Sequence, residues 1–423
     1  QLYFENGETQ KRYYTFFRKL CYTILMNQII FHIDVNSAFL SWSALEKLKQ
    51  GDCTDLRTIP SIIGGDTKTR HGVVLAKSIP AKAYGIRTGE PVTDALKKCP
   101  FLVSCPPDHK LYSEKSRLLM EYLADICPDL EQVSVDECYM DFTPIAARYQ
   151  SPAAAAHTIK DGIRDTFGFT VNIGISDKKV LAKMASDFKK PDLVHTLYQS
   201  EIAKKMWPLP LSSLFMCGRS SVEALHNLGL LTIGDLATSD PQIIVSHLKS
   251  HGKMLWEFAN GIDDSRVTTI PTEAKGVGNS TTLSQDALTP ADISKCLLGL
   301  SESVASRLRK AHLKASMVSV EIKYSSFQTT SHQTTLLTAT NDSGAIYDTA
   351  RKLALELWNG TPVRLLGVRT SKLENEDAPT QLSLSDLTAK NPLSEKQKSL
   401  NEALDKIRAK YGKDAIVRGT LLK

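Results

Sequence analysis

The stretch that decides the fold is Ser134-Val-Asp-Glu-Cys-Tyr-Met-Asp141. Apolar residues, among them Val133 and Val135, alternate with polar ones, and this alternation predicts a strand with Asp136 and Glu137 adjacent at its middle. Successive side chains of a strand point to opposite faces, so two neighbouring carboxylates share a ligand only where the strand bends or a divalent cation lies close to both. The stretch therefore predicts a metal-binding strand.

A third acid stands much earlier in the chain. An apolar strand is predicted from Gln28 to Asp34, and it ends on that acid. If the two strands are neighbours in one sheet, Asp34 meets Asp136 and Glu137. Carboxylates are hard oxygen ligands of the kind that Mg²⁺ and Mn²⁺ prefer, and two such ions held close together are a common device for phosphoryl transfer.

Length and composition describe a globular chain of several domains. At 423 residues with 42% hydrophobic residues, two to four domains can each bury a core. No window approaches eighteen uninterrupted apolar residues, so we expect no membrane span. The eight cysteines form no C-x-x-C pair, which argues against zinc sites and against a secreted disulfide framework and favours the reducing cytoplasm.

The charge is mildly basic, and it is concentrated near the C-terminus. Residues 271–423 contain 21 Lys and Arg against 16 Asp and Glu, which gives +5 of the net +6. A basic C-terminal domain beside a carboxylate-rich centre fits an enzyme that binds nucleic acid, because cations bind the backbone while acids hold metal. A solvated charged surface is the alternative interpretation.

Residues 1–26 look foreign to the fold. Gln1–Asn6 has the composition of a protease-site linker, and Met26 stands just before the first predicted strand, as a natural start would. We therefore expect a leader or tag-like segment, which is excluded from the functional argument. The alternative is a short aromatic and basic amphipathic helix that binds a partner.

Two regions near the first strand favour phosphate binding. The helix predicted after Asn36 carries Phe39 and Trp42 at helical spacing, and its N-terminal N–H groups would face a phosphate held by the metals. Lys183 lies in a second helix that opens at Lys178, where dipole and ammonium groups both attract anions. Gly64-Gly65-Asp66 resembles a cyclase signature, although a turn followed by Asp explains it equally.

The C-terminal half contains two further patterns. Residues 218–236 resemble a helix-hairpin-helix, which aims backbone amides at a DNA phosphate, and 251–253 form a second possible turn. An ordinary pair of packed helices is the alternative. In the last domain, strands at 317–324, 333–338 and 363–372 alternate with two helices, which predicts a small sheet with one exposed polar face. That face could lie in a DNA groove.

Taken together, these motifs resemble a Y-family (translesion) DNA polymerase of the DNA polymerase IV type. The resemblance rests on Asp34 with Phe39, on Ser134–Glu137, on Gly174–Ser176 with Lys183, and on the 218–236 hairpin, and it runs from about residue 28 to the C-terminus. It implies an α+β, multidomain right hand with a ferredoxin-like palm, small fingers, a helical thumb with a helix-hairpin-helix, and an α/β little-finger domain. The implied boundaries are palm 27–46 and 108–206, fingers 47–107, thumb 207–270, linker 271–278 and little finger 279–423.

The resemblance also implies site residues. The metal-binding acids would be Asp34, Asp136 and Glu137, with the Val35 carbonyl as a further ligand, holding two Mg²⁺ ions or Mn²⁺ in their place. The nucleotide-binding residues would be Ser37, Ala38, Phe39, Ser78, Lys82 and Lys183. The DNA-binding residues would be Gly218, Arg219, Gly252, Lys253 and Lys323. Phe39 matches the steric gate that excludes a ribose 2′-OH, and simple core packing is the alternative for that ring.

Three positions depart from the family pattern. Ile79 stands where Tyr is usual, so one hydrogen-bond donor is lost. Lys82 stands where Arg is usual, so the point charge of an ammonium replaces the planar guanidinium with its several donors. Weaker nucleotide affinity is the expected result. Gln381, Leu382 and Leu384 resemble a sliding-clamp peptide, but Ser385 replaces its aromatic residue, which should cost affinity. A plain strand edge is the alternative there.

The implied function is template-directed DNA synthesis of low fidelity in translesion synthesis. Its partners would be primer-template DNA, deoxynucleoside triphosphates and a sliding clamp, and the protein would be a cytoplasmic monomer associated with the bacterial nucleoid. Two other functions stay open at this point. One is a palm-type nucleotidyl cyclase or transferase that needs no primer, and the other is a non-catalytic DNA-binding protein of the same fold.

Overall fold

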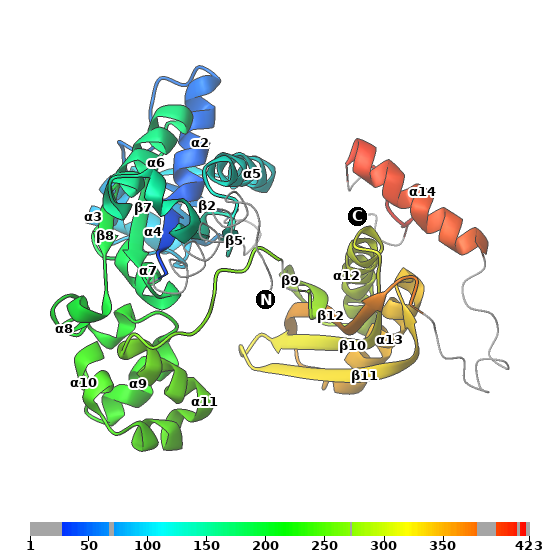
Figure 1. Ribbon diagram of the computed structural model, residues 1–423. Helices are drawn as coiled ribbons and strands as arrows, with labels where there is room; N and C mark the ends of the chain where they lie inside the picture. Colours follow the sequence, from blue (N-terminus) through cyan, green and yellow to red (C-terminus); the bar gives the residue numbers. More distant parts are fainter. Residues whose placement is uncertain (1–27, 67–71, 271–272, 379–394, 413–414, 420–423) are drawn as a thin grey trace, which may run out of the picture. The chain divides into compact units, whose positions relative to one another are not determined.

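The computed structural model describes residues 28–66, 72–270, 273–378, 395–412 and 415–419 (Figure 1). Residues up to 65 and from 73 to 270 form one compact unit, and residues from 273 onward form a second. Among these described residues, none of the helices has the length and apolar character needed to cross a bilayer.

The first unit is built on a five-stranded sheet with the order β5-β6-β1-β7-β8. The strands are β1 Ile30–Val35, β5 Leu130–Gln132, β6 Glu137–Asp141, β7 Val171–Ser176 and β8 Val194–Thr196. β1 pairs antiparallel with both β6 and β7. The chain order β1, α5 (His109–Ile126), β5, β6, α6 (Pro152–Phe167), β7 is a β-α-β-β-α-β unit. This arrangement is the predicted ferredoxin-like fold.

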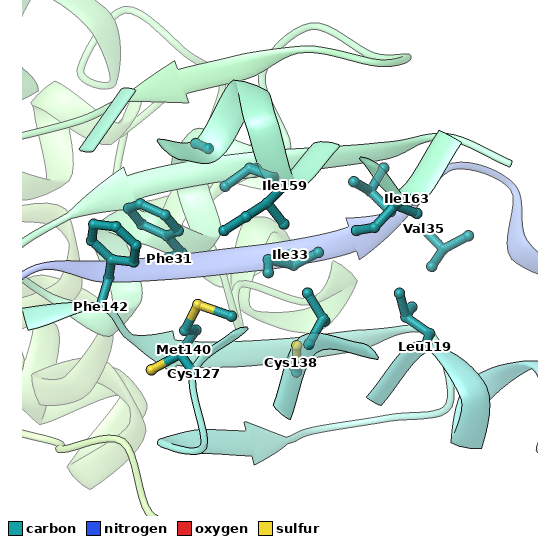
Figure 2. Packing of buried hydrophobic residues seen from close by; sticks show 14 of the residues in the cluster. Phe31, Ile33, Val35, Leu119, Cys127, Cys138, Met140, Phe142, Ile159 and Ile163 are labelled. Carbon is teal, nitrogen blue, oxygen red and sulfur yellow. The ribbon is translucent and has the colours of Figure 1, made fainter. Parts of the chain in front are cut away.

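The two faces of this sheet are covered by different helices. Phe31, Ile33 and Val35 of β1 point into a core that contains residues of α5 and α6, and Figure 2 shows them beside Ile159 and Ile163. Because side chains alternate along a strand, the residues between them, including Asp34, face the other side. That side is covered by α7 (Lys179–Ser186).

Gly174 allows α7 to lie close against the sheet. An added Cβ at Gly174 would stand 2.0 Å from the Ala182 carbonyl oxygen and 2.5 Å from the Ser186 nitrogen, both in or at the end of α7. Only a residue without a side chain permits this approach. The approach fixes the distance between α7 and the acidic end of β1.

The predicted strand over 134–141 is wrong in its first half. β6 begins at Glu137, and the residues before it form the turn of the β5–β6 hairpin, closed by the Val133 N–H donating to the Glu137 carbonyl at 3.1 Å. Val133 and Val135 are exposed turn residues, 49% and 38% accessible, so their alternation did not report a buried face. Asp136 and Glu137 therefore lie at the end of the sheet and not at its middle.

A three-stranded sheet with the order β3-β2-β4 carries the region after α2 (Ala38–Lys49). Its strands are β2 Ser61–Gly64, β3 Val74–Lys77 and β4 Val103–Cys105, with the helices α3 Ile79–Ala83 and α4 Val92–Lys98. β2 and β3 form an antiparallel hairpin. Leu40 and Ala44 of α2 pack on this sheet, whereas Trp42 packs in the core of the larger one. Gly64 is the last residue of β2 and Gly65-Asp66 follow it, so this motif is not part of the sheet that carries Asp34.

Short helices form the end of the first unit. They include α9 Arg219–Asn227, α10 Ile233–Thr238 and α11 Pro241–Ala259. α9 and α10 are the two helices expected on either side of a hairpin turn. The second turn, predicted at 251–253, is displaced: α11 is broken at Lys249 (φ 55°), while Gly252 is buried within its second half. A Cβ at Gly252 would stand 2.7 Å from Leu248 Cβ, so this glycine serves close packing.

The second unit has a four-stranded sheet with the order β11-β10-β12-β9, and α12 and α13 pack against one face of it. Its elements are β9 Gly276–Ala287, α12 Pro290–Lys310, β10 Leu313–Tyr324, β11 Thr329–Thr340, α13 Ser343–Leu357, β12 Val363–Asn375 and α14 Glu395–Tyr411. The predicted sheet with two helices on one face is confirmed. β9 was not predicted, because its sequence is largely polar and lacks a regular alternation.

We expect Gly174→Ala to lower the free energy of unfolding by about 3 kcal/mol, because its Cβ would collide with the backbone of α7. Gly299→Ala is the matched control: this helical glycine has open space around its Cβ position, so Ala should be neutral or stabilise by up to about 1 kcal/mol. Denaturant unfolding followed by circular dichroism measures both. Equal stability of the two variants would show that α7 moves aside at no cost.

Candidate active site

The structure brings the three predicted acids together at one end of the five-stranded sheet. Asp34 and Glu137 are paired across β1 and β6, and Asp136 precedes Glu137. The Val35 N–H donates to the Asp136 carbonyl at 3.0 Å, which ties the hairpin turn to β1. Ser134 Oγ donates to Asp136 Oδ1 at 2.6 Å and holds that side chain in the turn.

Two lysines lie among these acids. Lys183 Nζ, on α7, is 2.8 Å from Glu137 Oε2 and 3.4 Å from Asp34 Oδ2. Lys190 Nζ is 2.7 Å from Asp34 Oδ1. Asp187 links the two, since its carboxylate contacts Lys183 at 3.3 Å and Lys190 at 3.0 Å. The close approach of α7 at Gly174 is what puts Lys183 within reach of the sheet.

The acids differ in their electrostatic environment. The contact with His32, together with Lys183, holds the pKa of Glu137 down at about 2. Burial raises the pKa of Asp136, and the negative charges of Asp34 and Glu137 add to that effect. Burial alone would lower the pKa of Lys183, but the neighbouring carboxylates raise it. Asp136 forms no ion pair among the described residues, so its charge is the one left without a compensating cation.

A cavity of about 610 Å³ opens beside the acids, between the ends of the two sheets. Of the predicted metal and nucleotide residues, its walls include Asp34, Val35, Ser37, Ala38, Phe39, Ser78, Lys82 and Asp136. Lys183 is not among the lining residues, since its ammonium is directed into the acids. Lys77, Arg57, Thr88 and Lys190 line the cavity and were not predicted. Their sequence surroundings show no periodicity or motif that would have identified them.

The N-terminus of α2 opens on this cavity. Ser37 adopts a left-handed conformation (φ 49°), its side chain does not cap the helix, and the first turn contains no acidic residue. The first backbone N–H groups of a helix have no intrahelical acceptor, and the helix dipole is positive at this end. The end of α2 is therefore suited to an anion.

Phe39 fits both of the roles considered for it. Its ring stacks on Tyr112 at a centroid distance of 4.4 Å with 11° between the planes, and it is half-buried against the core. The same residue lines the cavity. Tyr112 is fixed in turn by a 2.9 Å hydrogen bond between its hydroxyl and Ser43 Oγ. A ring held in this way is a rigid part of the cavity wall.

Ser78 and its neighbours form the opposite wall. Ser78 is buried and caps α3: its hydroxyl accepts from the Ala81 and Ser61 N–H groups at 3.1 Å and donates to the Ile59 carbonyl at 2.7 Å. That hydroxyl is fully used within the protein. Lys82 is exposed, and Ile79 is 64% exposed. This wall therefore presents the ammonium group of Lys82 and the apolar side chain of Ile79 to the cavity.

The donor atoms at the acidic end fit a hard divalent cation. Among the described residues no three His, Cys, Asp or Glu side chains form a ready metal cage, and Lys183 lies between Asp34 and Glu137. Asp136, however, faces the cavity without a cation, and it stands beside two further carboxylates. Hard oxygen donors in this number and type suit Mg²⁺ or Mn²⁺.

The predicted DNA-binding residues are distributed over both units. Gly218 precedes α9 with open space around it, Arg219 is exposed and paired with Glu223 at 2.9 Å, and Lys253 is exposed on α11. Gly252 is buried and presents no surface. Lys323 belongs to the second unit. The clamp residues Gln381, Leu382 and Leu384 and the leader 1–26 lie outside the described residues.

Comparisons with known proteins agree on one family. Residues 33–187 match the impB/mucB/samB family, and residues 274–384 match the C-terminal domain of that family. A DNA polymerase IV of Clostridium acetobutylicum is 46% identical over 398 residues, which cover 94% of this chain and 99% of the relative. The chain belongs to the Y family of DNA polymerases.

Other similar proteins agree with this assignment. DNA polymerase IV 1 of Bacillus subtilis is 34% identical, with 94% of each chain covered. The solved structure of a Y-family DNA polymerase chimera, Dbh-Dpo4(243-245)-Dbh, has the same fold, with a TM-score of 0.70 at 19% identity over 81% of this chain and 98% of that one. The chain is a DNA-directed DNA polymerase of the translesion class, and thus a metal-dependent nucleotidyltransferase. This result replaces the cyclase and the non-catalytic alternatives.

We expect Lys183→Met to lower the free energy of unfolding by about 2 to 3 kcal/mol without metal, because the largely buried Glu137 and Asp34 lose a shared ammonium group and Asp34 is left with Lys190. Mg²⁺ should recover much of this loss by binding between them. Lys179→Met is the matched control, since this lysine lies on the same helix with the same 12% exposure but pairs with Glu131. Thermal unfolding with and without Mg²⁺ measures the difference. Equal recovery in both variants would contradict the expectation.

Proposed function

We propose that this polymerase joins deoxynucleotides to a primer 3′-OH by a two-metal mechanism at the acidic end of β1 and β6. The observation that carries the proposal is the convergence of Asp34, Asp136 and Glu137 beside a cavity of about 610 Å³ that is also lined by a helix N-terminus and three lysines, Lys77, Lys82 and Lys190. Acids for metal and positive groups for phosphate are the two requirements of phosphoryl transfer.

The acids would hold two Mg²⁺ ions, or Mn²⁺, with the Val35 carbonyl as a further ligand. Bound ions of this kind lower the pKa of an attacking hydroxyl and neutralise charge on the phosphates and the leaving pyrophosphate. Asp136, half-buried and without an ion pair among the described residues, would supply the carboxylate most in need of a cation. Asp34 and Glu137 both contact Lys183 in this structure. With metal bound, they would hold the ions from the neighbouring strands β1 and β6.

The triphosphate would be bound by the other groups that line the cavity. The backbone amides of Ser37, Ala38 and Phe39 offer an anion site, and Lys82 adds a positive charge. The predicted contact of Lys183 with the triphosphate stays a prediction, and its position favours a role in holding Asp34 and Glu137 together. Lys190 is better placed for the phosphates, because it lines the cavity and is one-third exposed.

The wall formed by Ala76, Ser78 and Ile79 presents small or apolar side chains to the cavity. Because the Ser78 hydroxyl is used to cap α3, its contribution to nucleotide binding would be to position that helix and Lys82. Few directional contacts over the nascent base pair would let damaged templates enter. Low fidelity is the corresponding cost.

DNA would be held by both units. The N-terminus of α9 at Gly218 and Arg219 would present a helix end to a phosphate backbone, and the exposed Lys253 on the second half of α11 would add a positive charge, while the buried Gly252 would contribute only through packing. In the second unit, Lys323 lies 5.3 Å from the ring centroid of Phe327. Arg364 stacks on the same exposed ring at 4.9 Å. A cationic and aromatic surface of this kind suits nucleic acid.

Three further parts of the proposal concern the setting of the reaction. We expect a monomer that works in the bacterial cytoplasm at the nucleoid, and the proteins that this chain resembles come from bacteria. The peptide Gln381, Leu382 and Leu384 stays a predicted contact with the sliding clamp. Its missing aromatic residue predicts a weak one.

The double variant Asp136→Ala with Glu137→Ala should abolish primer extension while DNA affinity changes less than about threefold, because the acids bind metal and not the DNA backbone. Its control is Glu121→Ala with Asp165→Ala, two exposed acids of the same unit that should leave extension unchanged. Extension of a primed template with Mg²⁺ and filter binding of the same DNA measure the two properties. Retained extension would remove the proposed catalytic centre.

Phe39→Ala should reduce the preference for deoxynucleotides over ribonucleotides by at least about tenfold, because the rigid ring that lines the cavity is removed. Phe101→Ala, at a 61% exposed ring on the same unit, should keep the preference. Single-nucleotide incorporation kinetics with both sugars measure it. If Phe39→Ala only lowers stability and leaves sugar selection intact, the ring belongs to the core alone.

A further inference from the structure

His32 is a buried polar residue on the face of the sheet that α7 covers. It lies on β1 two residues before Asp34, is fully buried, and faces α7. Its Nδ1 is 2.8 Å from Ser186 Oγ, and its Nε2 is 3.2 Å from Glu137 Oε2. Its ring meets the edge of Tyr139 at a centroid distance of 4.7 Å. Burying an imidazole is costly, and a leucine would fill the same space, so these two polar contacts need an explanation.

The two contacts select one tautomer of the ring. A neutral imidazole carries a single N–H, either on Nδ1 or on Nε2. The Ser186 hydroxyl can donate either to the Lys183 carbonyl, 2.8 Å away, or to Nδ1. If it donates to the carbonyl, the Nε2 lone pair faces the ionised carboxylate of Glu137. If it donates to Nδ1, the hydrogen is on Nε2 and points to Glu137.

The second arrangement is favoured because the 2.8 Å ion pair with Lys183 identifies Glu137 as a carboxylate, which attracts an N–H and repels a lone pair. Nε2 lies 3.2 Å from Glu137 Oε2 outside ideal hydrogen-bond geometry, and the described residues offer this buried atom no hydrogen-bond partner, so Glu137 is the acceptor within its reach. Ser186 therefore acts through the ring: its hydroxyl sets the tautomer that donates to the acid.

Both donors to Glu137 meet at the same oxygen. Lys183 Nζ is 2.8 Å from Oε2, and His32 Nε2 approaches that atom from β1. With Oε2 held from two sides, Oε1 is the oxygen left for another partner. We propose that His32 is a positioning residue that holds Glu137 through Oε2 and so presents Oε1 to the divalent cation. This proposal rests on the two-metal function above.

An outer partner of this type fixes the orientation of a metal-binding carboxylate, and its removal commonly costs 10- to 100-fold in metal affinity. Without the imidazole, Glu137 keeps only the flexible Lys183 ammonium as a donor, and its side chain gains freedom to turn away from Asp34. The loss should therefore appear in metal binding and in kcat. The KM for the nucleotide should change little, because His32 does not line the cavity.

The test is Mn²⁺ binding to the full chain bound to primer-template DNA, measured by electron paramagnetic resonance without nucleotide. We expect His32→Leu to bind Mn²⁺ at least about tenfold more weakly than the wild type. His32→Gln, whose amide can still donate to Glu137, should stay within about threefold. Steady-state kinetics should show a lower kcat for His32→Leu at a nearly constant KM. Equal Mn²⁺ affinity of His32→Leu and the wild type would overturn the proposal.

Ser186→Ala tests the same network if His32→Leu does not fold. It removes the hydroxyl that sets the tautomer while the ring stays in place. We expect this variant to lose Mn²⁺ affinity by about threefold or more. If the ring is only a packing element, the Mn²⁺ affinity should not change. The function itself is tested separately: if Asp136→Ala with Glu137→Ala binds Mn²⁺ as the wild type does, the metal site is wrong. If only the His32 and Ser186 variants bind normally, the metal site stands and the positioning role fails.

Discussion

The mutual repulsion of Asp34, Asp136 and Glu137 is the constraint on which the rest of the first unit depends. Three carboxylates at one end of a sheet, partly removed from water, favour protonation or separation unless positive charge lies among them. The chain supplies part of that charge itself, through Lys183 and Lys190, and leaves Asp136 facing the cavity without any. The site is thus held together in a form that still favours the entry of a cation.

That balance depends on backbone geometry far more than on the acids alone. Lys183 reaches the sheet because Gly174 lets α7 approach to a distance that any side chain would prevent. The N-terminus of α2 faces the same cavity because the helix packs on two sheets at once, through Trp42 on one and Leu40 on the other. The elements that carry no charge therefore decide where the charged groups meet, and the chemistry is fixed by packing.

Sequence patterns predicted most of this architecture, and their failures have physical causes. The acids and the buried strands β1 and β7 could be found because apolar runs that end in charge are rare. Alternation misplaced Asp136 at mid-strand, because Val133 and Val135 alternate in an exposed turn. Lys190 could not be predicted, since its position depends on where the chain after α7 folds back toward β1. The polar strand β9 offered no apolar pattern to detect.

The departures at Ile79 and Lys82 gain a different meaning from this geometry. If α3 supplied most of the contacts to a triphosphate, the apolar Ile79, which is 64% exposed in its first turn, would lower the affinity for the triphosphate substantially. The cavity, however, receives positive groups from three other directions: the amides at the start of α2, Lys77 on β3, and Lys190 beside Asp34. Electrostatic attraction from several sides is less directional than a hydrogen bond from one tyrosine hydroxyl and a bidentate contact from one arginine guanidinium. A site built in this way would bind the phosphates while it places few restrictions on the base above them, which is the combination that a polymerase of damaged templates requires.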